Sequence, residues 1–207
     1  MGRLINGPNG PYIGKAGSYI GYVVNGVGYI KGIYKRRTKA PTKDEAFNRE
    51  KFAVAQRYLR SLIYYVKPGF KGYNPRFQGF AAAKSYLMRN ALKVIDGKIV
   101  IDPALVKISF GNLRLPDDIK CEFQEPDIMR VTWKPSGIGA SDQAMILFHN
   151  TEAADPFGSV YGNYRQSGEE TVVVKNPHGT TLHGYLAFVA ADRSRQSDSM
   201  YLGKFEF

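Results

Sequence analysis

The sequence predicts an α+β protein in which a basic N-terminal part, with a β-hairpin and two helices, precedes an immunoglobulin- or fibronectin-like β-sandwich. Glycine-rich strands near the N-terminus, helically spaced apolar residues after them and short alternating runs from residue 119 onward support this prediction. Composition and charge both change near Leu115–Pro116. We therefore place the two parts at residues 1–115 and 119–207.

Glycine dominates the start of the chain. Residues 1–33 contain nine of the 22 glycines, which prevents a stable helix because each glycine costs ~1 kcal/mol there relative to alanine. The runs Tyr19–Val24 and Val27–Lys31 flank Asn25–Gly26, the favoured pair for a type I′ turn, so we predict a hairpin. Glycines inside these strands would leave room for a neighbouring backbone or a ligand.

Two helices are predicted next. Thr42 and Glu45 form a capping box, and Lys67–Pro68–Gly69 ends the first helix. Its apolar residues have helical spacing: Phe52, Ala55, Leu59, Leu62, Ile63 and Val66. The second helix is predicted to begin at Asn74–Pro75, with a buried stripe formed by Phe77, Phe80, Ala81, Leu87, Met88 and Ala91. A turn at Asp96–Gly97 and the run Leu105–Phe110 complete the sheet elements of the first part.

The second part reads as a series of short strands. We predict them at Lys120–Phe123, Ile128–Trp133, Gln143–His149, Ser159–Tyr164, Glu170–Val174, Leu182–Ala190 and Met200–Phe205. Seven strands in about 90 residues suggest a β-sandwich with Trp133 in its core. Cys121 is the only cysteine, so no intramolecular disulfide can form, which favours the fibronectin-like variant.

The net charge of +11 is unevenly distributed. Residues 1–115 contain 21 Lys and Arg against 5 Asp and Glu, whereas residues 116–207 contain 8 against 13. The candidate polyanion-binding residues lie in the glycine-rich N-terminal region, in the basic run that follows it and in the first helix: Lys15, Lys31, Lys35, Arg36, Arg37, Lys39, Lys43, Arg49, Arg57 and Arg60. Lys and Arg can neutralise phosphates, and the interleaved tyrosines (Tyr12, Tyr19, Tyr22, Tyr29 and Tyr34) can stack on unpaired bases if they are exposed.

Two other interpretations of this basic region stay open. The tyrosines could pack within the hairpin while the cations only solvate one face. Alternatively, the basic half could meet the acidic half of another copy, and a head-to-tail contact of that kind gives rings or filaments.

Catalytic and cofactor motifs are missing from the sequence. Between Gly10 and Gly14 there are three residues instead of the four of a phosphate-binding loop, and Ala16 replaces its Ser or Thr. His149, His178 and His183 do not have the spacing of a helical zinc pair, and we expect them on the sandwich surface or in loops. No Gly-x-Ser-x-Gly elbow occurs, and Cys121 is expected to face a strand core. We predict no enzyme activity, no catalytic residues, no metal site and no cofactor.

The sequence also bears on location. No apolar run approaches the ~18 residues of a membrane span, and residues 1–8 lack the apolar region of an ordinary signal peptide. We expect the protein in the cytoplasm or in a particle assembled there.

Several short motifs together resemble a known family. They are the pattern Gly7–Pro8, Gly10, Gly14–Lys15, Gly17 and Ile20–Gly21–Tyr22, then Lys35–Arg36, Phe70–Lys71–Gly72–Tyr73, Val131–Thr132–Trp133, Ser141–Asp142 and Tyr201–Leu202. The chain resembles, over nearly its whole length, an uncharacterised family of Bacteroidota proteins that is known only as a domain of unknown function. The resemblance implies a bacterial or phage-related origin and carries over no catalytic residue.

These observations lead to one expected function and one alternative. We expect a non-enzymatic structural protein that self-associates, as a particle or filament component, and whose basic N-terminal part contacts nucleic acid or another polyanion. Homo-oligomers or larger assemblies would be its partners, and no small-molecule substrate is evident. The alternative is a surface or adhesion module in which the β-sandwich binds a protein or a glycan.

Overall fold

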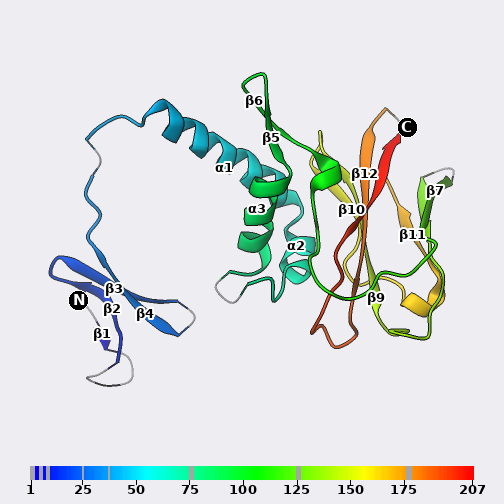
Figure 1. Ribbon diagram of the computed structural model, residues 1–207, viewed down its shortest axis with the longest axis horizontal. Coiled ribbons are helices and arrows are strands. Elements are labelled where there is room, and N and C mark those ends of the chain that lie inside the picture. Colours follow the sequence, from blue (N-terminus) through cyan, green and yellow to red (C-terminus); the bar gives the residue numbers. More distant parts are fainter. Residues whose placement is uncertain are drawn as a thin grey trace. The chain divides into compact units, whose positions relative to one another are not determined.

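A computed structural model describes residues 3–4, 7, 10–24, 26–36, 38–74, 77–124, 127–175 and 179–207. Contacts between residues fall into two compact groups, so the chain divides into an N-terminal unit, Met1–Glu45, and a C-terminal unit, Ala46–Phe207. In the described residues, three α-helices accompany antiparallel strands in several sheets (Figure 1). The predicted α+β class is therefore confirmed.

The N-terminal unit contains an antiparallel sheet with the strand order β1-β2-β3-β4. Its strands are β1 (Arg3–Leu4), β2 (Tyr12–Ala16), β3 (Tyr19–Val24) and β4 (Val27–Gly32). The predicted hairpin is confirmed, because β3 pairs with β4 from Val24 opposite Val27 to Tyr19 opposite Gly32. Gly26 has a left-handed φ of 80°, as a type I′ turn requires, while Asn25 lies outside the described residues.

Two glycines of this hairpin make room for another part of the same sheet. A Cβ atom at Gly21 would lie 2.2 Å from the carbonyl oxygen of Tyr12, and one at Gly28 would lie 2.6 Å from the Cβ of Pro11. Pro11 and Tyr12 therefore cross over the face that these glycines leave flat. This close approach confirms that the strand glycines accommodate a neighbouring backbone.

The first predicted helix is two helices in the structure, α1 (Lys43–Ser61) and α2 (Ile63–Gly69). The predicted capping box is present: Thr42 N donates to Glu45 Oε2 at 3.0 Å, and Glu45 N donates to Thr42 Oγ1 at 3.3 Å. The prediction of one continuous helix was wrong at Leu62, where the backbone leaves helical geometry (ψ 10°).

Two other predictions for this region were also wrong. The last helix, α3 (Gly79–Asn90), begins five residues after Asn74, because Gly79 takes a left-handed φ of 55° and its N–H donates to Phe70 O. The run Leu105–Phe110 is not a strand. Its backbone and side-chain groups bond elsewhere: Ile108 N donates to Ser199 Oγ, and Ser109 Oγ to Ser197 O.

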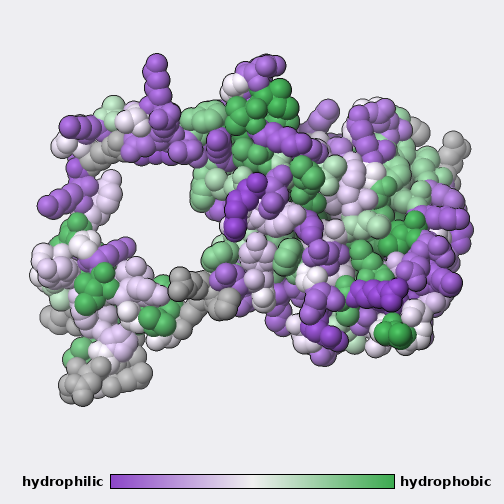
Figure 2. Space-filling view, in the orientation of Figure 1, coloured by the Kyte–Doolittle hydropathy of each residue, from purple (hydrophilic) through white to green (hydrophobic). Residues whose placement is uncertain are grey.

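A second hairpin follows α3. Strands β5 (Leu92–Ile95) and β6 (Lys98–Ile101) pair around Asp96 and Gly97, whose φ angles are 49° and 74°. Two positive φ values are what a type I′ turn needs, so the predicted Asp-Gly turn is confirmed. Figure 2 shows apolar surface on this hairpin, where Val94, Ile95 and Val100 are exposed.

The last seven strands form two sheets that share a buried core. A four-stranded sheet has the order β10-β9-β12-β13, made of Asp155–Ser159, Gln143–Asn150, Thr181–Val189 and Met200–Glu206. A three-stranded sheet has the order β11-β8-β7, made of Glu169–Val173, Ile128–Thr132 and Lys120–Gln124. Buried residues of both sheets, with Trp133 among them, form one cluster, and half-buried Cys121 packs against it as predicted. The strand predicted at Ser159–Tyr164 was wrong in position, since β10 ends at Ser159.

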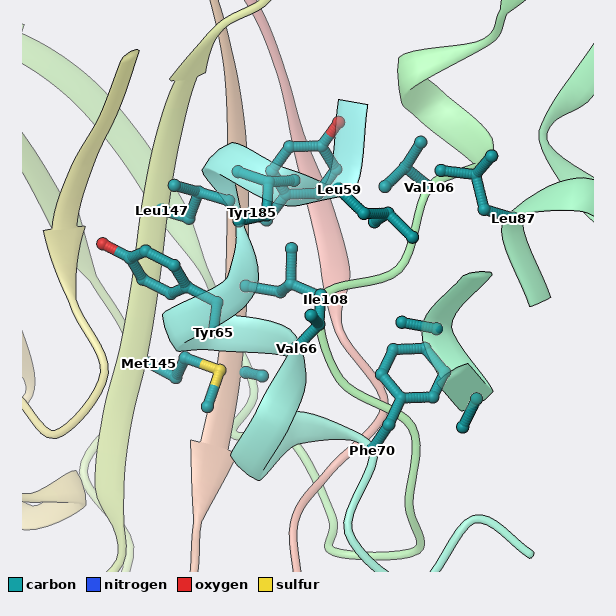
Figure 3. Close-up of a cluster of buried hydrophobic side chains, with 14 of the residues drawn as sticks. Leu59, Tyr65, Val66, Phe70, Leu87, Val106, Ile108, Met145, Leu147 and Tyr185 are labelled. Carbon is teal, nitrogen blue, oxygen red and sulfur yellow. The ribbon is translucent and has the colours of Figure 1, made fainter. Parts of the chain in front are cut away.

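The helices cover the other face of the four-stranded sheet. Leu59, Tyr65 and Val66 pack with Leu147 of β9 and Tyr185 of β12 in a second cluster (Figure 3). Strand β9 is therefore buried on both faces, which explains why it reads as a nearly continuous apolar run. The helices and the two C-terminal sheets thus share the C-terminal unit. The boundary near residue 115, which concerns independent folding, stays a prediction.

Candidate functional site

Several of the predicted polyanion-binding residues lie on one face of the N-terminal sheet. In antiparallel pairs, residues that are directly opposite point to the same face. Lys15 lies opposite Ile20, and Ile20 opposite Lys31. Tyr22 is two residues from Ile20 on β3, and Tyr29 is two residues from Lys31 on β4. These two tyrosines also lie opposite each other. We call the face formed by Lys15, Ile20, Tyr22, Tyr29 and Lys31 the basic face.

The aromatic and cationic groups of the basic face contact one another. The rings of Tyr22 and Tyr29 stack with their centroids 5.5 Å apart, and Lys31 Nζ lies 5.2 Å from the centroid of Tyr22. Tyr29 is 47% exposed. The first acidic residue of the chain is Asp44, so no carboxylate within the sheet neutralises these lysines. The face can therefore offer positive charge and aromatic surface side by side.

More predicted residues follow the sheet in an extended segment. Tyr34 is 80% exposed there, and Lys35, Arg36 and Lys39 are exposed as well. Lys43 is the first residue of α1. Arg37 was also predicted as a site residue but lies outside the described residues.

The predicted arginines of the first helix share one side of α1. Arg49, Arg57 and Arg60 are all exposed. At 100° per residue they fall within an arc of about 80°, while the buried Ala55 and Leu59 lie on the opposite side. The structure thus groups the predicted cations on a sheet face, in an extended segment and on one side of a helix.

The other predicted tyrosines do not join the basic face. Tyr19 lies opposite Gly32 on the reverse face of the sheet, where it is exposed. Tyr12 belongs to the segment that crosses Gly21. The strand pairing shows that these two tyrosines lie apart from Tyr22 and Tyr29. Their spacing along the sequence does not reveal this difference.

Comparison with known proteins assigns the chain to a family. The model of a family of unknown function, DUF6266, matches residues 11–203. The chain belongs to DUF6266. No curated protein and no solved structure matches it. The family match includes β2, β3 and β4 together with the helices and the strands of the C-terminal unit. The resemblance to a family of unknown function is confirmed, while the Bacteroidota origin stays a prediction.

A polar site within the C-terminal unit was not predicted for the DUF6266 chain. His149 of β9 and His183 of β12 are both buried and lie directly opposite each other, so the expectation of surface or loop histidines was wrong for this pair. His178 lies outside the described residues. His149 Nε2 is 3.2 Å from Ser61 Oγ on α1. In the sequence, His149 directly follows the apolar run Ala144–Phe148, and this position could have indicated that it is buried.

The described part of the DUF6266 chain contains neither a cluster of metal ligands nor a helix that could span a membrane. Within that part, no three His, Cys, Asp or Glu side chains lie close enough together to hold a metal ion. None of the helices described there is long and apolar enough to span a membrane. Burial raises the pKa of Cys121 to about 12, so its thiol is a poor nucleophile near neutral pH.

Proposed function

We propose that this DUF6266 protein is a structural, self-associating protein whose basic N-terminal part contacts nucleic acid or another polyanion. The observation that carries the proposal is the basic face, on which Lys15 and Lys31 lie in the cross-strand row next to the stacked rings of Tyr22 and Tyr29. Cations attract phosphates, and exposed tyrosine rings offer a surface on which unpaired bases can stack. A single strand of nucleic acid is the polyanion that uses both features.

Binding to single-stranded DNA over a salt series tests this proposal. Fluorescence anisotropy with a 20-nucleotide strand should give an affinity that falls linearly with the logarithm of the salt concentration. Each phosphate contact contributes about 0.7 to the slope for single strands, so replacing Lys15 and Lys31 by Ala should lower it by about 1.4. Tyr29→Ala should weaken binding while leaving the slope unchanged, because stacking releases no counterions.

A matched control separates the basic face from charge in general. Lys120 is an exposed lysine on β7 of the C-terminal unit, and Lys120→Ala removes the same charge from a strand outside the N-terminal sheet. That variant should keep the wild-type slope. The proposal fails if the full chain does not bind at low salt, or if Lys120→Ala lowers the slope as much as the changes on the basic face.

A specific observation supports self-association. Among the described residues of the N-terminal unit, only Gly21 is buried. Many of its large apolar side chains are exposed, and Figure 2 shows apolar surface on this unit: Leu4, Ile13, Tyr19, Val24, Val27, Tyr29, Ile30, Ile33 and Tyr34. A sheet needs a packed hydrophobic face for independent stability. We propose that a second copy supplies it.

The reverse face of the sheet suits such a contact. It carries Tyr19 and Ile30, Pro11 and Tyr12 cross over it at Gly28 and Gly21, and none of the β3 and β4 side chains on it is charged. Two copies can pack these reverse faces together while both basic faces point outward. The lysines of the two copies then stay apart, which avoids the cost of bringing like charges together.

Sedimentation of the full chain tests this contact. Ile30 is 66% exposed, and Ile30→Asp places a charge in the proposed interface. The variant should sediment as a smaller species than the wild type at the same concentration. Ile138, 86% exposed in a loop of the C-terminal unit, gives the control Ile138→Asp, which should not change the mass. A wild-type chain that is monomeric at high concentration would refute the proposal.

We further infer that the two C-terminal sheets form a fibronectin-like sandwich. The strand order supports it, because the first, second and fifth strands make one sheet and the other four make the second. A surface or adhesion role for this sandwich, with a protein or glycan ligand, stays the alternative hypothesis. A wild-type chain that sediments as a monomer and does not bind nucleic acid would favour this alternative.

A further inference from the structure

Strand β4 forms one edge of the N-terminal sheet. Among the described residues it pairs with a strand on one side only, and all six of its residues, Val27–Gly32, are exposed. An edge strand presents backbone N–H and C=O groups that can bond another strand, so proteins usually protect such edges with proline, bulges or charges. Strand β4 contains no proline, pairs with β3 without a bulge and carries Lys31 as its single charge. Its edge is therefore open to a further strand.

The hydrogen bonds of the hairpin identify the backbone groups at this edge. Ile33 N donates to Ser18 O at 3.1 Å, so these two opposite residues form a hydrogen-bonded pair. Hydrogen-bonded and non-hydrogen-bonded pairs alternate along an antiparallel ladder. The N–H and C=O groups of the odd-numbered β4 residues therefore point toward β3. Those of the even-numbered residues point toward the open edge: Gly28, Ile30 and Gly32.

The sequence of β4 is complementary to a second copy of itself. When two β4 strands pair antiparallel around Ile30, Gly28 of each copy lies opposite Gly32 of the other, and each Tyr29 lies opposite a Lys31. The residues that point to the edge then form the hydrogen-bonded pairs. Each lysine meets an aromatic ring on the basic face, and the two isoleucines meet on the reverse face.

The neighbouring registers are less favourable. A shift by one residue places groups that point to the edge opposite groups that point toward β3, so no ladder can form. Pairing around Lys31 brings two lysines directly opposite each other, which destabilises a cross-strand pair. Pairing around Tyr29 places Ile30 opposite Gly28 and takes the tyrosine away from the lysine.

We propose that two copies of this chain pair through their β4 edges, antiparallel and centred on Ile30, so that two four-stranded sheets continue as one. This rests on the proposed self-association and names the strand through which it occurs. The two-fold axis of such a pair is perpendicular to the sheet, so both basic faces lie on the same side and form one surface. The reverse faces lie together on the other side, where two such pairs can pack.

Cysteine cross-linking reports both the contact and its register. Ile30 belongs to the edge and to the reverse face, so the test uses residues of the basic face. Opposite residues of a non-hydrogen-bonded pair have Cα atoms about 4.5 Å apart, which a disulfide can span. In a full chain with Cys121→Ser, which removes the only native thiol, a mixture of Tyr29→Cys and Lys31→Cys should form cross-linked dimers under mild oxidation. Each variant alone should form far fewer, because its two cysteines are diagonal neighbours about 7–8 Å apart.

The other outcomes separate this contact from self-association in general. Tyr29→Cys that cross-links with itself would indicate pairing around Tyr29, and the same result for Lys31→Cys would indicate pairing around Lys31. Either result overturns the proposed register. If only the reverse faces pack, the basic faces point outward and the mixture does not cross-link. An associating wild-type chain whose mixed variants do not cross-link would overturn the edge contact alone, whereas a monomeric wild-type chain would refute both proposals.

Proline at the edge tests the backbone hydrogen bonds. Gly32→Pro removes an N–H that points to the edge, and an added Cβ at this position meets nothing within 4 Å. Gly32→Ala adds the same Cβ and keeps the N–H, so it is the matched control. Because the symmetric contact loses two hydrogen bonds with proline, association of the full chain should weaken at least about tenfold relative to alanine, as measured by sedimentation. Equal association of the two variants would contradict the edge pairing, and the cross-linking test serves even if Gly32→Pro does not fold.

Discussion

Gly21 is a residue at which the N-terminal sheet has no room for a side chain. Its backbone lies so close to Tyr12 that an added Cβ would be 2.2 Å from the Tyr12 carbonyl oxygen and 2.7 Å from its ring. Because a backbone atom cannot move aside as a flexible side chain can, we expect Gly21→Ala to destabilise the sheet by about 1–3 kcal/mol. Hydrogen exchange of the β3 and β4 amides in the full chain measures this directly, and the exchange should become faster.

Gly32 provides the control for that prediction. It lies on the same hairpin, but an added Cβ would meet nothing within 4 Å. Gly32→Ala should therefore change stability by no more than about 0.5 kcal/mol. If both variants exchanged at the same rate, the crossing of Tyr12 over Gly21 could not be the reason for the glycine.

His149 should make the stability of the C-terminal unit depend on pH. Burial, and to a smaller extent the charge of His183, lower its pKa from 6.5 to about 4. Unfolding therefore takes up a proton between these values. The stability is fully present above pH 6.5 and is lost as the pH falls to 4, by about 3 kcal/mol. Urea unfolding at several pH values should show this loss, and His149→Phe should remove it. A variant with the wild-type slope would assign the pH dependence to other groups.

At the scale of elements, the start of α1 depends on its cap. No residue between Lys43 and Val54 is buried, so packing does little to hold these first turns. Thr42→Ala removes the hydroxyl that accepts from Glu45 N and should cost about 1 kcal/mol. Amide exchange in residues 44–50 should become faster. Thr38→Ala, in the segment before the helix, is the control, and equal exchange in both variants would contradict the role of the cap.

Turn chemistry and capping made several elements predictable from sequence. The Asn-Gly and Asp-Gly pairs identify both hairpins, because only a few residues adopt the required positive φ, and the capping box identifies the start of α1. These signals are local, so they need no knowledge of the fold.

Long-range contacts explain the elements that could not be predicted. The helix α3 starts late because Gly79 N bonds to Phe70 O at the end of α2. The run Leu105–Phe110 has strand-like residues, but Ser199 and Ser197 take its hydrogen bonds. The same limit applies to the candidate site: the sequence identifies the lysines and tyrosines, while only the strand register separates Tyr22 and Tyr29 from Tyr19.

For the whole molecule, charge and packing divide the chain at different places. The excess of basic residues ends near residue 115. Packing instead joins the helices to the two C-terminal sheets, because β9 contributes Leu147 to the cluster under the helices and Phe148 to the cluster between the sheets. Charge determines what a surface attracts, whereas shared buried residues determine what unfolds together.

Unfolding of the full chain can decide whether the helices form a domain of their own. Trp133 is the only tryptophan and reports on the sandwich by fluorescence, while circular dichroism at 222 nm reports mainly on α1, α2 and α3. Leu59→Ala leaves a cavity where α1 meets the sheet and should cost about 2–5 kcal/mol. If the helices and the sandwich unfold as one unit, the variant should shift both urea transitions equally. A shift of the circular dichroism transition alone would support the predicted boundary near residue 115.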